Sequence, residues 1–326
     1  MSKFLPRVLF WVLTGLVVAT TLLPLSGNQE WWIRGWDFPR LHIALVALAT
    51  AALGLLFCSR SIVFGIALLA AAFAYQSLRI FPYTMWATQE IAITDNAPEE
   101  EQISIISVNV LMQNTDYSSV IEMVEREVPD VLFLMETDET WVEALKPVLA
   151  RFETVITYPL ENHYGVVFAT NLPVVDADVV FLSDDETPSI LADLEGPTGN
   201  FFFVGLHPRP PVPGQDTDER DEQIKRAALL ADREVLPVVA MGDFNDVAWS
   251  RTSERFKEYG EFRDPRVGRG MIPSFDATSW WMRFPIDQLY LTEGLDLISF
   301  SRLDPVGSDH FPMKAIIAVQ DDTKFE

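Results

Sequence analysis

Val238-Val-Ala-Met-Gly-Asp-Phe-Asn245 is a short apolar run that ends in polar side chains. Its first four residues are apolar, which predicts a buried β-strand over 238–241. Two side chains capable of chemistry, Asp243 and Asn245, come directly after this strand. Loops at strand ends are held in place by a rigid sheet, and they commonly carry functional side chains. The stretch therefore predicts a strand that ends at a candidate site.

An apolar strand followed by a polar side chain occurs three more times along the chain. The polar residues in these places are Asn109, Glu136 and His207. Taken singly, each has an ordinary structural explanation, because a carboxylate after a strand more often caps a turn or a helix than it catalyses a reaction. The functional signal lies in the whole set and in its order along the chain.

The second part of the chain alternates short strands with a few helices. Strands are predicted at 103–110, 131–135, 164–169, 174–181, 201–206, 238–241, 286–291 and 312–319. Amphipathic spacing predicts helices at 117–128 and 216–235. This mixture favours an α/β sandwich over a helical bundle or an all-β barrel.

Three apolar runs open the sequence, at about 8–25, 41–58 and 62–80. Each is close to the ~17–25 residues that cross a bilayer as a helix, and Arg79 is the one charged residue within them. We therefore predict a membrane anchor over 1–80 with three transmembrane helices. The first run could instead be a secretory signal, but no clear cleavage site follows it. Residues 81–102 are predicted to be a linker, and 103–326 a folded domain.

The orientation of the anchor follows weakly from its positive charges. With the amino terminus inside, Lys and Arg near the helix ends are equal in number on the two sides. The amino-terminal tail, with Lys3 and Arg7 and no acid, favours the inner side. An odd number of helices then predicts an integral membrane protein of a bacterial inner or plasma membrane, with the 103–326 domain on the extracytoplasmic side.

Charge separates the two parts of the chain. The formal net charge of the whole chain is −23, and the first 80 residues contain six basic and two acidic residues, so the remainder carries about −27. A field of this sign repels polyanions at long range, which argues against a generic nucleic-acid binder. Cys58 is the one cysteine, so the chain has no internal disulfide and its cysteine usage does not define a compartment.

Six short motifs follow one another along the second part. They are Val108-Asn109-Val110, Pro129-Asp-Val-Leu-Phe-Leu-Met-Glu136, His207-Pro208, Gly242-Asp-Phe-Asn245, Ile286-Asp287 and Gly307-Ser-Asp-His310. In this order they resemble the motifs of the endonuclease/exonuclease/phosphatase superfamily, which includes surface DNases, apurinic endonucleases, inositol-phosphate phosphatases and neutral sphingomyelinases. The resemblance covers about 103–319. It implies a four-layered α/β sandwich, with two central β-sheets flanked by helices, in a membrane-anchored member of bacterial type.

The resemblance also implies a role for each matching residue. Glu136 would be the metal carboxylate, with Asn109 and Asp309 as further metal contacts. Asp243 would orient and deprotonate the attacking water. Because hard divalent cations prefer oxygen ligands, the implied cofactor is Mg²⁺ or Mn²⁺.

The remaining matches would act on the phosphate and the leaving group. His310 would contact the phosphate or shuttle a proton, and Asp287 would fix its tautomer and favour its charged form. Asn245 and His207 would donate hydrogen bonds to the substrate. The transition state of phosphoryl transfer gathers charge on the phosphoryl oxygens, so such donors stabilise it.

Two positions depart from the family pattern. Thr170-Asn171 stands where Ser-Arg or Ser-Lys is common, so a basic contact is missing, and Gln288 follows Asp287 where His or Tyr is common. These departures speak against a long nucleic acid as substrate. His163 is expected to have a structural role or to lie at the substrate rim.

Four basic residues after His207 have two possible readings: Arg209, Arg220, Lys225 and Arg226. They are expected to lie on a solvated helix face beside several acidic residues, and a phosphate-binding rim is the alternative.

The leading prediction is a hydrolase that cleaves phosphoester bonds by an activated water, with a divalent metal, at a membrane surface. Its substrate would be a lipid headgroup, a small phosphate ester or a nucleic acid, and membrane lipid would surround its anchor. No protein partner can be inferred. Two alternatives are a membrane-anchored nuclease acting on DNA or RNA, and a membrane scaffold whose folded domain is catalytically silent.

Overall fold

The protein is represented by a computed structural model that describes residues 4–56, 60–184 and 186–320. The chain divides into two compact units. The first unit extends to Ala87 and includes Pro211–Thr217, and the second consists of Thr88–Pro210 and the residues from Asp218 onward. Within the first unit the Thr217 N–H donates to the carbonyl of Gln29 (2.9 Å). The helix predicted over 216–235 accordingly begins at Asp218 and ends at Ala231.

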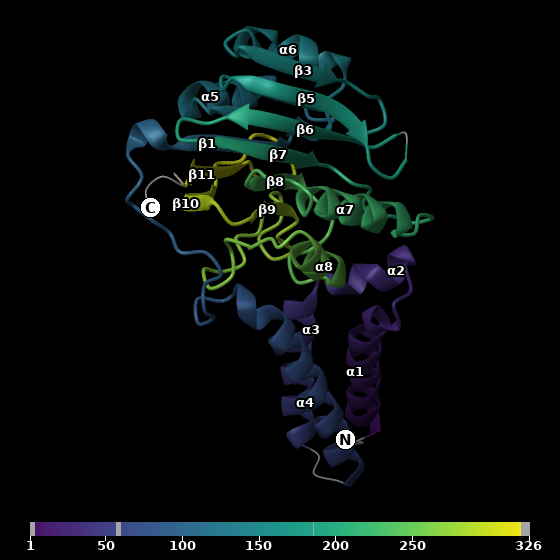
Figure 1. The fold of residues 1–326 in the computed structure, drawn as a ribbon. Helices are drawn as coiled ribbons and strands as arrows, with labels where there is room; N and C mark the ends of the chain where they lie inside the picture. The colour runs from purple at the N-terminus through teal and green to yellow at the C-terminus, as the bar shows by residue number, and fades with distance from the viewer. Residues whose placement is uncertain (1–3, 57–59, 185, 321–326) are drawn as a thin grey trace. The chain divides into compact units, whose positions relative to one another are not determined.

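Three helices form most of the first unit. They are α1 (Phe4–Leu22), α3 (Arg40–Leu55) and α4 (Arg60–Ile80) (Figure 1). Two glycines allow them to pack closely, because a Cβ atom at Gly54 or Gly65 would lie 2.5 or 2.6 Å from the ring of Phe10. That ring is fully buried, so the three helices meet around it.

Two of these helices are long and apolar enough to cross a membrane: α1 with its extension η1 (Leu23–Ser26), and α4 with η3 (Phe81–Tyr83). A third span is reached only if α3 is joined to the preceding short helices α2 (Trp31–Arg34) and η2 (Gly35–Asp37), from which it is bent by 74°. The predicted three transmembrane helices are therefore two or three. The end of the second predicted run, including Cys58, lies outside the described residues.

A buried polar chain links the helices of the first unit. Arg40 donates to Gln76 (3.0 Å), and Gln76 donates to Thr21 (3.1 Å), so α3, α4 and α1 are joined in turn. Asp37 pairs with Arg40 and with Arg34 (3.6 Å), and all three of these charged side chains are buried. Arg34 and Arg40 are thus partly neutralised by Asp37. The count of positive charges at the helix ends is therefore a weaker guide to the orientation of the anchor.

The second unit contains two mixed β-sheets, in the orders β10-β11-β1-β2-β4-β3 and β5-β6-β7-β8-β9. The strands of the first sheet are β1 (Ile103–Asn109), β2 (Val131–Met135), β3 (Thr154–Tyr158), β4 (Val166–Thr170), β10 (Leu295–Arg302) and β11 (Met313–Val319). Those of the second are β5 (Val174–Phe181), β6 (Pro188–Glu195), β7 (Asn200–Leu206), β8 (Val238–Asp243) and β9 (Asp287–Leu291).

Apolar side chains fill three interfaces in this unit. Between the sheets, Phe133 and Phe168 of the first pack against Phe203 of the second, with ring centroids 6.0 and 5.5 Å apart. The outer face of the first sheet is covered by α5 (Tyr117–Glu127) and α6 (Glu139–Leu149), and that of the second by α7 (Asp218–Ala231) and α8 (Arg251–Tyr259) (Figure 1). The predicted four-layered α/β sandwich is confirmed.

Five elements of this unit were not predicted: β3, β6, β10, α6 and α8. Two of them, β3 and β10, are the edge strands of the first sheet, and many of their side chains are exposed. An edge strand needs fewer apolar residues than a central one, so its sequence pattern is weaker. Pro147 lies inside α6, and such a residue usually argues against a helix.

The strand ends that carry polar side chains lie side by side. β1 runs parallel to β2 and pairs Asn109 with Met135, the residue before Glu136. β7 likewise runs parallel to β8, and Leu206 pairs with Gly242. Gly242 has φ 144°, and a Cβ atom there would lie 2.1 Å from the Leu206 carbonyl oxygen, so only glycine fits directly before Asp243.

Candidate active site

One carboxylate oxygen is the point on which the predicted residues converge. Asp243 Oδ2 lies 3.1 Å from Asn109 Nδ2, 3.6 Å from His310 Nε2 and 3.8 Å from His207 Nε2. The four residues come from β1, β8, the loop before β11 and the end of β7, and all are buried. Both sheets therefore contribute to one polar cluster, which lies at the ends of their strands.

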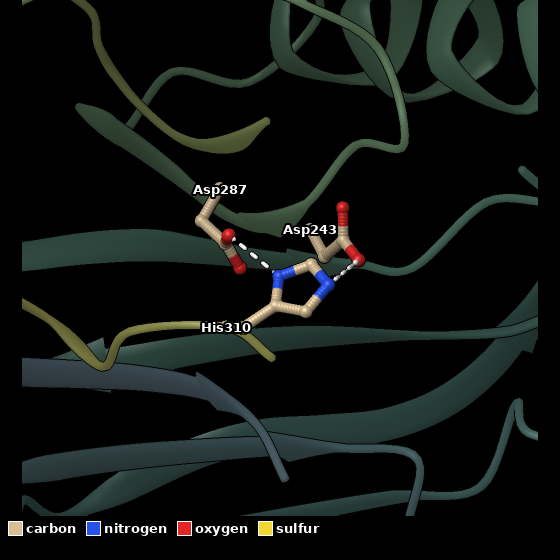
Figure 2. Close-up of side chains that lie close together, drawn as sticks. All are labelled: Asp243, Asp287 and His310. Atoms are coloured by element: carbon tan, nitrogen blue, oxygen red, sulfur yellow. Dashed lines mark hydrogen bonds and ion pairs between the residues drawn. The ribbon is translucent and has the colours of Figure 1, made fainter. Parts of the chain in front are cut away.

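Asp287 holds His310 from the side opposite Asp243. Its Oδ2 lies 2.8 Å from His310 Nδ1, and Figure 2 shows the imidazole between the two carboxylates. Burial opposes protonation of the imidazole, but the charges of Asp287 and Asp243 outweigh burial and raise the pKa of His310. Burial also raises the pKa of Asp243. The protonation of His310 thus depends on the negative charges of the two carboxylates beside it.

His207 has the opposite electrostatic character. Burial lowers its pKa to about 4, so the imidazole is neutral at physiological pH and its 3.8 Å approach to Asp243 is not an ion pair. The ring of Tyr164 packs on it with centroids 5.5 Å apart. Its Nδ1 has no hydrogen-bond partner among the described residues. A neutral imidazole can offer one N–H donor to a substrate.

Glu136 is surrounded by donors. Its Oε1 accepts from Asn109 Nδ2 (2.9 Å), and its Oε2 accepts from the Met112 N–H (3.2 Å) and lies 3.0 Å from His163 Nδ1. Burial opposes ionisation of this carboxyl group, but His207, His163 and Asn109 outweigh burial and lower the pKa of Glu136. The group is therefore a carboxylate with its negative charge retained at neutral pH.

Three residues at the site have a backbone conformation that is uncommon for residues other than glycine. Glu136 has φ 61°, His163 has φ 71° and Asn245 has φ 49°. The left-handed region costs a non-glycine residue about 1–2 kcal/mol, and asparagine tolerates it best. Strain of this kind clusters at functional sites, where the surrounding structure maintains it.

Ser308 links the motif Gly307-Ser-Asp-His310 to β1 by a hydrogen bond. Ser308 Oγ donates to the carbonyl of Asn109 (2.7 Å) and accepts from the His310 N–H (3.0 Å). Burial raises the pKa of Asp309, and the charge of Glu136 contributes to the rise. The metal contact that the resemblance implies for Asp309 stays a prediction.

Asn245 is held at both its backbone and its side chain. Its N–H donates to Asp243 Oδ1 (2.8 Å), and its Nδ2 donates to the carbonyl of Pro208 (2.9 Å). Its carbonyl accepts from Arg220 Nη1 (3.1 Å), and Arg220 also pairs with Asp246 (3.0 Å). One N–H of the Asn245 amide remains available, and its direction is fixed by the bond to Pro208.

The four basic residues after His207 do not form a phosphate rim. Arg220 is fully buried beneath Asn245, which differs from both expectations for it. Arg209 is surrounded by Asp184, Glu186 and Glu219, so its charge is already neutralised. Lys225 and Arg226 pair with Glu222 on the exposed face of α7, as expected for a solvated helix.

His163 has a more specific position than the sequence indicates. Its Nδ1 faces Glu136, and its Nε2 lies 3.0 Å from Gln113 Nε2, while its side chain remains 45% exposed.

Phe275, which no sequence motif singled out, packs its ring on His310 with centroids 4.8 Å apart. Neither Phe275 nor His163 follows a predicted strand, so the rule based on strand ends does not assign them to the site.

Both departures from the family pattern have a structural explanation. Thr170 pairs with Val131, at the end of β2 away from Glu136, and donates to the Asp130 carbonyl (2.8 Å). The missing basic residue is therefore not part of the site. Gln288 donates to the carbonyl of Asp246 (2.7 Å) and so supports the loop that carries Asn245.

The residues around Glu136 fit a divalent cation by their chemistry. Glu136 is an ionised oxygen donor, and the carboxyl group of Asp309 is a second candidate ligand whose pKa the charge of Glu136 helps to raise. Asn109 presents its NH₂ group to Glu136 and Asp243, while its oxygen accepts from the Leu111 N–H (3.0 Å). Its amide would therefore have to turn before its oxygen could join the ligands.

A second group of ligand atoms lies deeper. One atom each of Asp243, Asp287 and His310 lie within 4.8 Å of one another, a spacing that could also hold a metal. However, both ring nitrogens of His310 already face carboxylates, and its raised pKa keeps the ring protonated. The imidazolium supplies the positive charge here, so Glu136 is the better candidate for a metal.

Comparison with known proteins gives one family and one fold. The model of the Endonuclease/Exonuclease/phosphatase family matches residues 106–310. No curated protein matches the sequence.

Three solved structures are similar. D. rerio TDP2 complexed with a single-strand DNA product has a TM-score of 0.56 at 16% identity, covering 67% of this chain and 99% of that one. The human Nocturnin catalytic domain with bound sulfate has a TM-score of 0.54 at 17% identity, covering 68% and 95%. ANGEL2, a 2′,3′-cyclic phosphatase in complex with adenosine-2′,3′-vanadate, has a TM-score of 0.53 at 13% identity, covering 67% and 96%. At such identities the likeness shows the fold.

Proposed function

Because the chain belongs to the endonuclease/exonuclease/phosphatase family and is thus a phosphoric ester hydrolase, we propose that it cleaves a phosphodiester with an activated water at a membrane surface. The observation that supports this chemistry best is the convergence of Asn109, His207 and His310 on Asp243 Oδ2. A water beside that oxygen would meet a base and, at the same time, donors for the phosphate it attacks. This arrangement favours an active enzyme over a catalytically silent scaffold.

Each buried group has a distinct part in the proposed reaction. Asp243 takes the proton of the attacking water, since its raised pKa makes it a stronger base than an ordinary carboxylate. His310, held by Asp287, is positively charged and stabilises the charge that develops on the phosphoryl oxygens. Neutral His207 and the free amide N–H of Asn245 donate further hydrogen bonds to the phosphate or leaving group.

Glu136 would hold the metal, with Asp309 and Asn109 as further contacts, and Mg²⁺ or Mn²⁺ suits this oxygen-rich set. A bound divalent cation supplies Lewis-acid stabilisation of the phosphoryl oxygens. His163 donates to Glu136 and so fixes the orientation of the carboxylate.

The substrate is proposed to be a phosphoester available at a membrane, either a lipid headgroup or a small phosphate ester. The two or three apolar helices of the first unit support attachment to a bilayer. Nucleic acid is the second candidate, because TDP2 is known in complex with a DNA product. The charge of about −27 on residues 81–326 makes a long duplex the less favourable choice.

The test is a substrate comparison with the full-length protein in lipid nanodiscs. Bis(p-nitrophenyl) phosphate, a short-chain phospholipid, a single-stranded oligonucleotide and p-nitrophenyl phosphate are each incubated with Mg²⁺, with Mn²⁺ and with a chelator. We expect hydrolysis of at least one diester that the chelator stops. Turnover that is equal with and without chelator would refute the metal-dependent mechanism.

The side of the membrane is a separate proposal. With the count of three spans, the amino-terminal charges Lys3 and Arg7 favour a second unit outside the cytoplasm, and this is the side we propose. Fusions of a periplasm-active phosphatase and of a cytoplasm-fluorescent reporter to the carboxyl end decide it. Phosphatase activity supports the proposal, and fluorescence without phosphatase activity overturns it.

A further inference from the structure

Two arginines share one aromatic ring beside the candidate active site. The guanidinium carbon of Arg302 lies 4.1 Å from the ring centroid of Phe311, and that of Arg283 lies 5.1 Å from the same centroid. Phe311 directly follows His310 and is only 6% exposed. The ring therefore holds two cations next to the reacting centre.

Neither arginine forms an ion pair within the part of the chain that the structure describes. Their hydrogen bonds go to backbone carbonyls instead, from Arg283 Nε to Ser279 (2.5 Å) and from Arg302 Nη1 to Pro273 (2.9 Å). By contrast, Arg209 and Arg220, which follow His207 along the chain, both have carboxylate partners. The two arginines thus have no carboxylate partner among the described residues, although residues 81–326 contain about 27 more acidic than basic residues.

The pair is electrostatically unfavourable without an anion. Burial lowers the pKa of Arg302, and the positive charge of Arg283 lowers it further. Like charges held close together repel, and a bound anion would turn that repulsion into attraction. Each guanidinium uses one of its five N–H groups in the bonds to carbonyls, so donors remain for an anionic oxygen.

The arginines are connected to the reacting centre through a short hairpin. Phe275 donates its N–H to the Phe284 carbonyl (3.0 Å), next to Arg283, and packs its ring on His310. The Phe311 N–H donates to the carbonyl of Ser274 (2.8 Å). The arginine pair and the catalytic histidine are thus fixed to the same backbone segment.

The tip of this hairpin is ordered by its own side chains. Asp276 Oδ1 accepts from the Thr278 N–H (2.7 Å), and Ser279 Oγ accepts from the Met282 N–H (3.0 Å). The tip nevertheless presents Trp280 and Trp281 to solvent, with 85% and 57% exposure. A hairpin with a fixed backbone thus carries two exposed indoles, two and three residues before Arg283 in the sequence.

We propose that Arg283 and Arg302 form a second anion subsite that binds a phosphate of the substrate other than the one that is cleaved. The preferred substrate is then a phosphodiester that carries an additional phosphate group, with an apolar or aromatic part that packs against Trp280. This inference rests on the proposed phosphodiesterase function. The additional phosphate could belong to a nucleotide or to a phosphorylated lipid headgroup, and the chemistry that recognises it is the same.

The test uses two matched pairs of substrates with the full-length protein in nanodiscs. One pair is the dinucleotide TpT with and without a 5′-phosphate, and the other is short-chain phosphatidylinositol with and without a 4-phosphate. Loss of the intact diester, followed by chromatography, gives kcat/KM for each compound. A charge-assisted hydrogen bond contributes about 1.5–3 kcal/mol, so we expect a preference of about tenfold or more for the phosphorylated member of one pair.

Three variants separate the subsite from the reaction itself. In Arg283→Gln/Arg302→Gln the preference should fall to nearly one, while turnover of bis(p-nitrophenyl) phosphate, which has a single phosphate, stays close to that of the wild type. Arg302→Gln alone should lose part of the preference. Arg255→Gln, which removes an exposed arginine of α8, is the matched control and should keep the preference.

The outcomes of this experiment separate the subsite from the proposed function. The inference is overturned if neither pair shows a preference, or if the preference survives in the double variant. Titration calorimetry of the same compounds with chelator present measures the preference without turnover. Arginine-dependent binding without any hydrolysis would support the subsite and refute the proposed function, and hydrolysis without the preference would do the reverse.

Discussion

The two carboxylates at the centre of the site, Glu136 and Asp243, follow neighbouring strand ends and yet have opposite properties. Glu136 keeps 14% of its side chain exposed, and His207 together with the N–H donors around the carboxylate lowers its pKa despite burial. The side chain of Asp243 is only 1% exposed, and burial raises its pKa. Glu136 therefore keeps its negative charge and is suited to hold a cation. Asp243, which is more deeply buried, is suited to take a proton.

The difference follows the two sheets in part. Asn109 and Glu136 of the proposed metal end come from the first sheet, and His207, Asp243 and Asp287 come from the second. His310 precedes β11 of the first sheet, so the proposed proton-transfer end is built from both sheets. Substitutions at one end should change metal dependence, and those at the other should change turnover.

The largest effect is expected at the metal end. Glu136→Ala should lower turnover of bis(p-nitrophenyl) phosphate at a fixed Mg²⁺ concentration by about 10³–10⁴-fold, because a Lewis-acid cation contributes several kcal/mol and each ~1.4 kcal/mol is tenfold. Turnover is measured over a range of Mg²⁺ concentrations, with the thermal unfolding midpoint as the control for folding. Turnover within tenfold of the wild type would remove Glu136 from the metal site.

Asp243→Asn tests the proton-transfer end. It keeps the shape of the side chain but removes the base, so kcat should fall by about 10³-fold while the half-saturating Mg²⁺ concentration changes little. Asp193→Asn on β6 is the matched control at a distance from the site. An equal loss of metal affinity and turnover would make Asp243 mainly a metal ligand and would break the proposed division of roles.

Arg220→Met tests the support beneath the proton-transfer end. Asp246 would be left buried and without this partner, which should lower the free energy of unfolding by roughly 3 kcal/mol. The double variant Arg220→Met/Asp246→Leu should regain most of this stability. Its kcat should nevertheless stay reduced, because the Asn245 carbonyl has lost the guanidinium that holds it. Full recovery of both quantities would limit Arg220 to a structural role.

The smallest effect is expected for His163→Ala. Loss of a residue that orients a metal ligand typically weakens metal binding by about 10–100-fold, and the partial exposure of His163 favours the lower limit. The half-saturating Mg²⁺ concentration should therefore rise by about tenfold, while kcat at saturating Mg²⁺ stays nearly constant. Asn162→Ala, one residue away, is the control. A reduced kcat with unchanged Mg²⁺ dependence would place His163 at the substrate instead.

Sequence reasoning found the strands that are buried on both faces and the polar residues that follow them. β2, β4, β7 and β8 have continuous apolar runs because both faces are covered, and such runs are easily read. The edge strands β3 and β10 lack this signal. A rule based on strand ends could likewise find Glu136 and Asp243 but not Phe275, which reaches His310 from a hairpin.

The burial and the charge partners of the arginines could not be predicted from the sequence pattern. Arg220 and Arg226 lie six residues apart on α7, but one is fully buried under Asn245 and the other pairs with Glu222 in solvent. Arg283 and Arg302 are distant in sequence and meet on one ring. The partner of each charge depends on tertiary contacts. A count of charges along the chain could therefore not tell which arginines lie in solvent, which support the site from below and which form the proposed anion subsite.

The hydrogen bond from Ser308 to the Asn109 carbonyl joins the first and the last parts of the second unit to be synthesised. β1 is the first strand of the second unit to be made and β11 is the last, and the two pair antiparallel next to that hydrogen bond. His310 can reach Asp243 only after β11 has been synthesised and has docked. The order of synthesis thus keeps His310 away from Asp243 until after the apolar helices and the other strands of the site have been made.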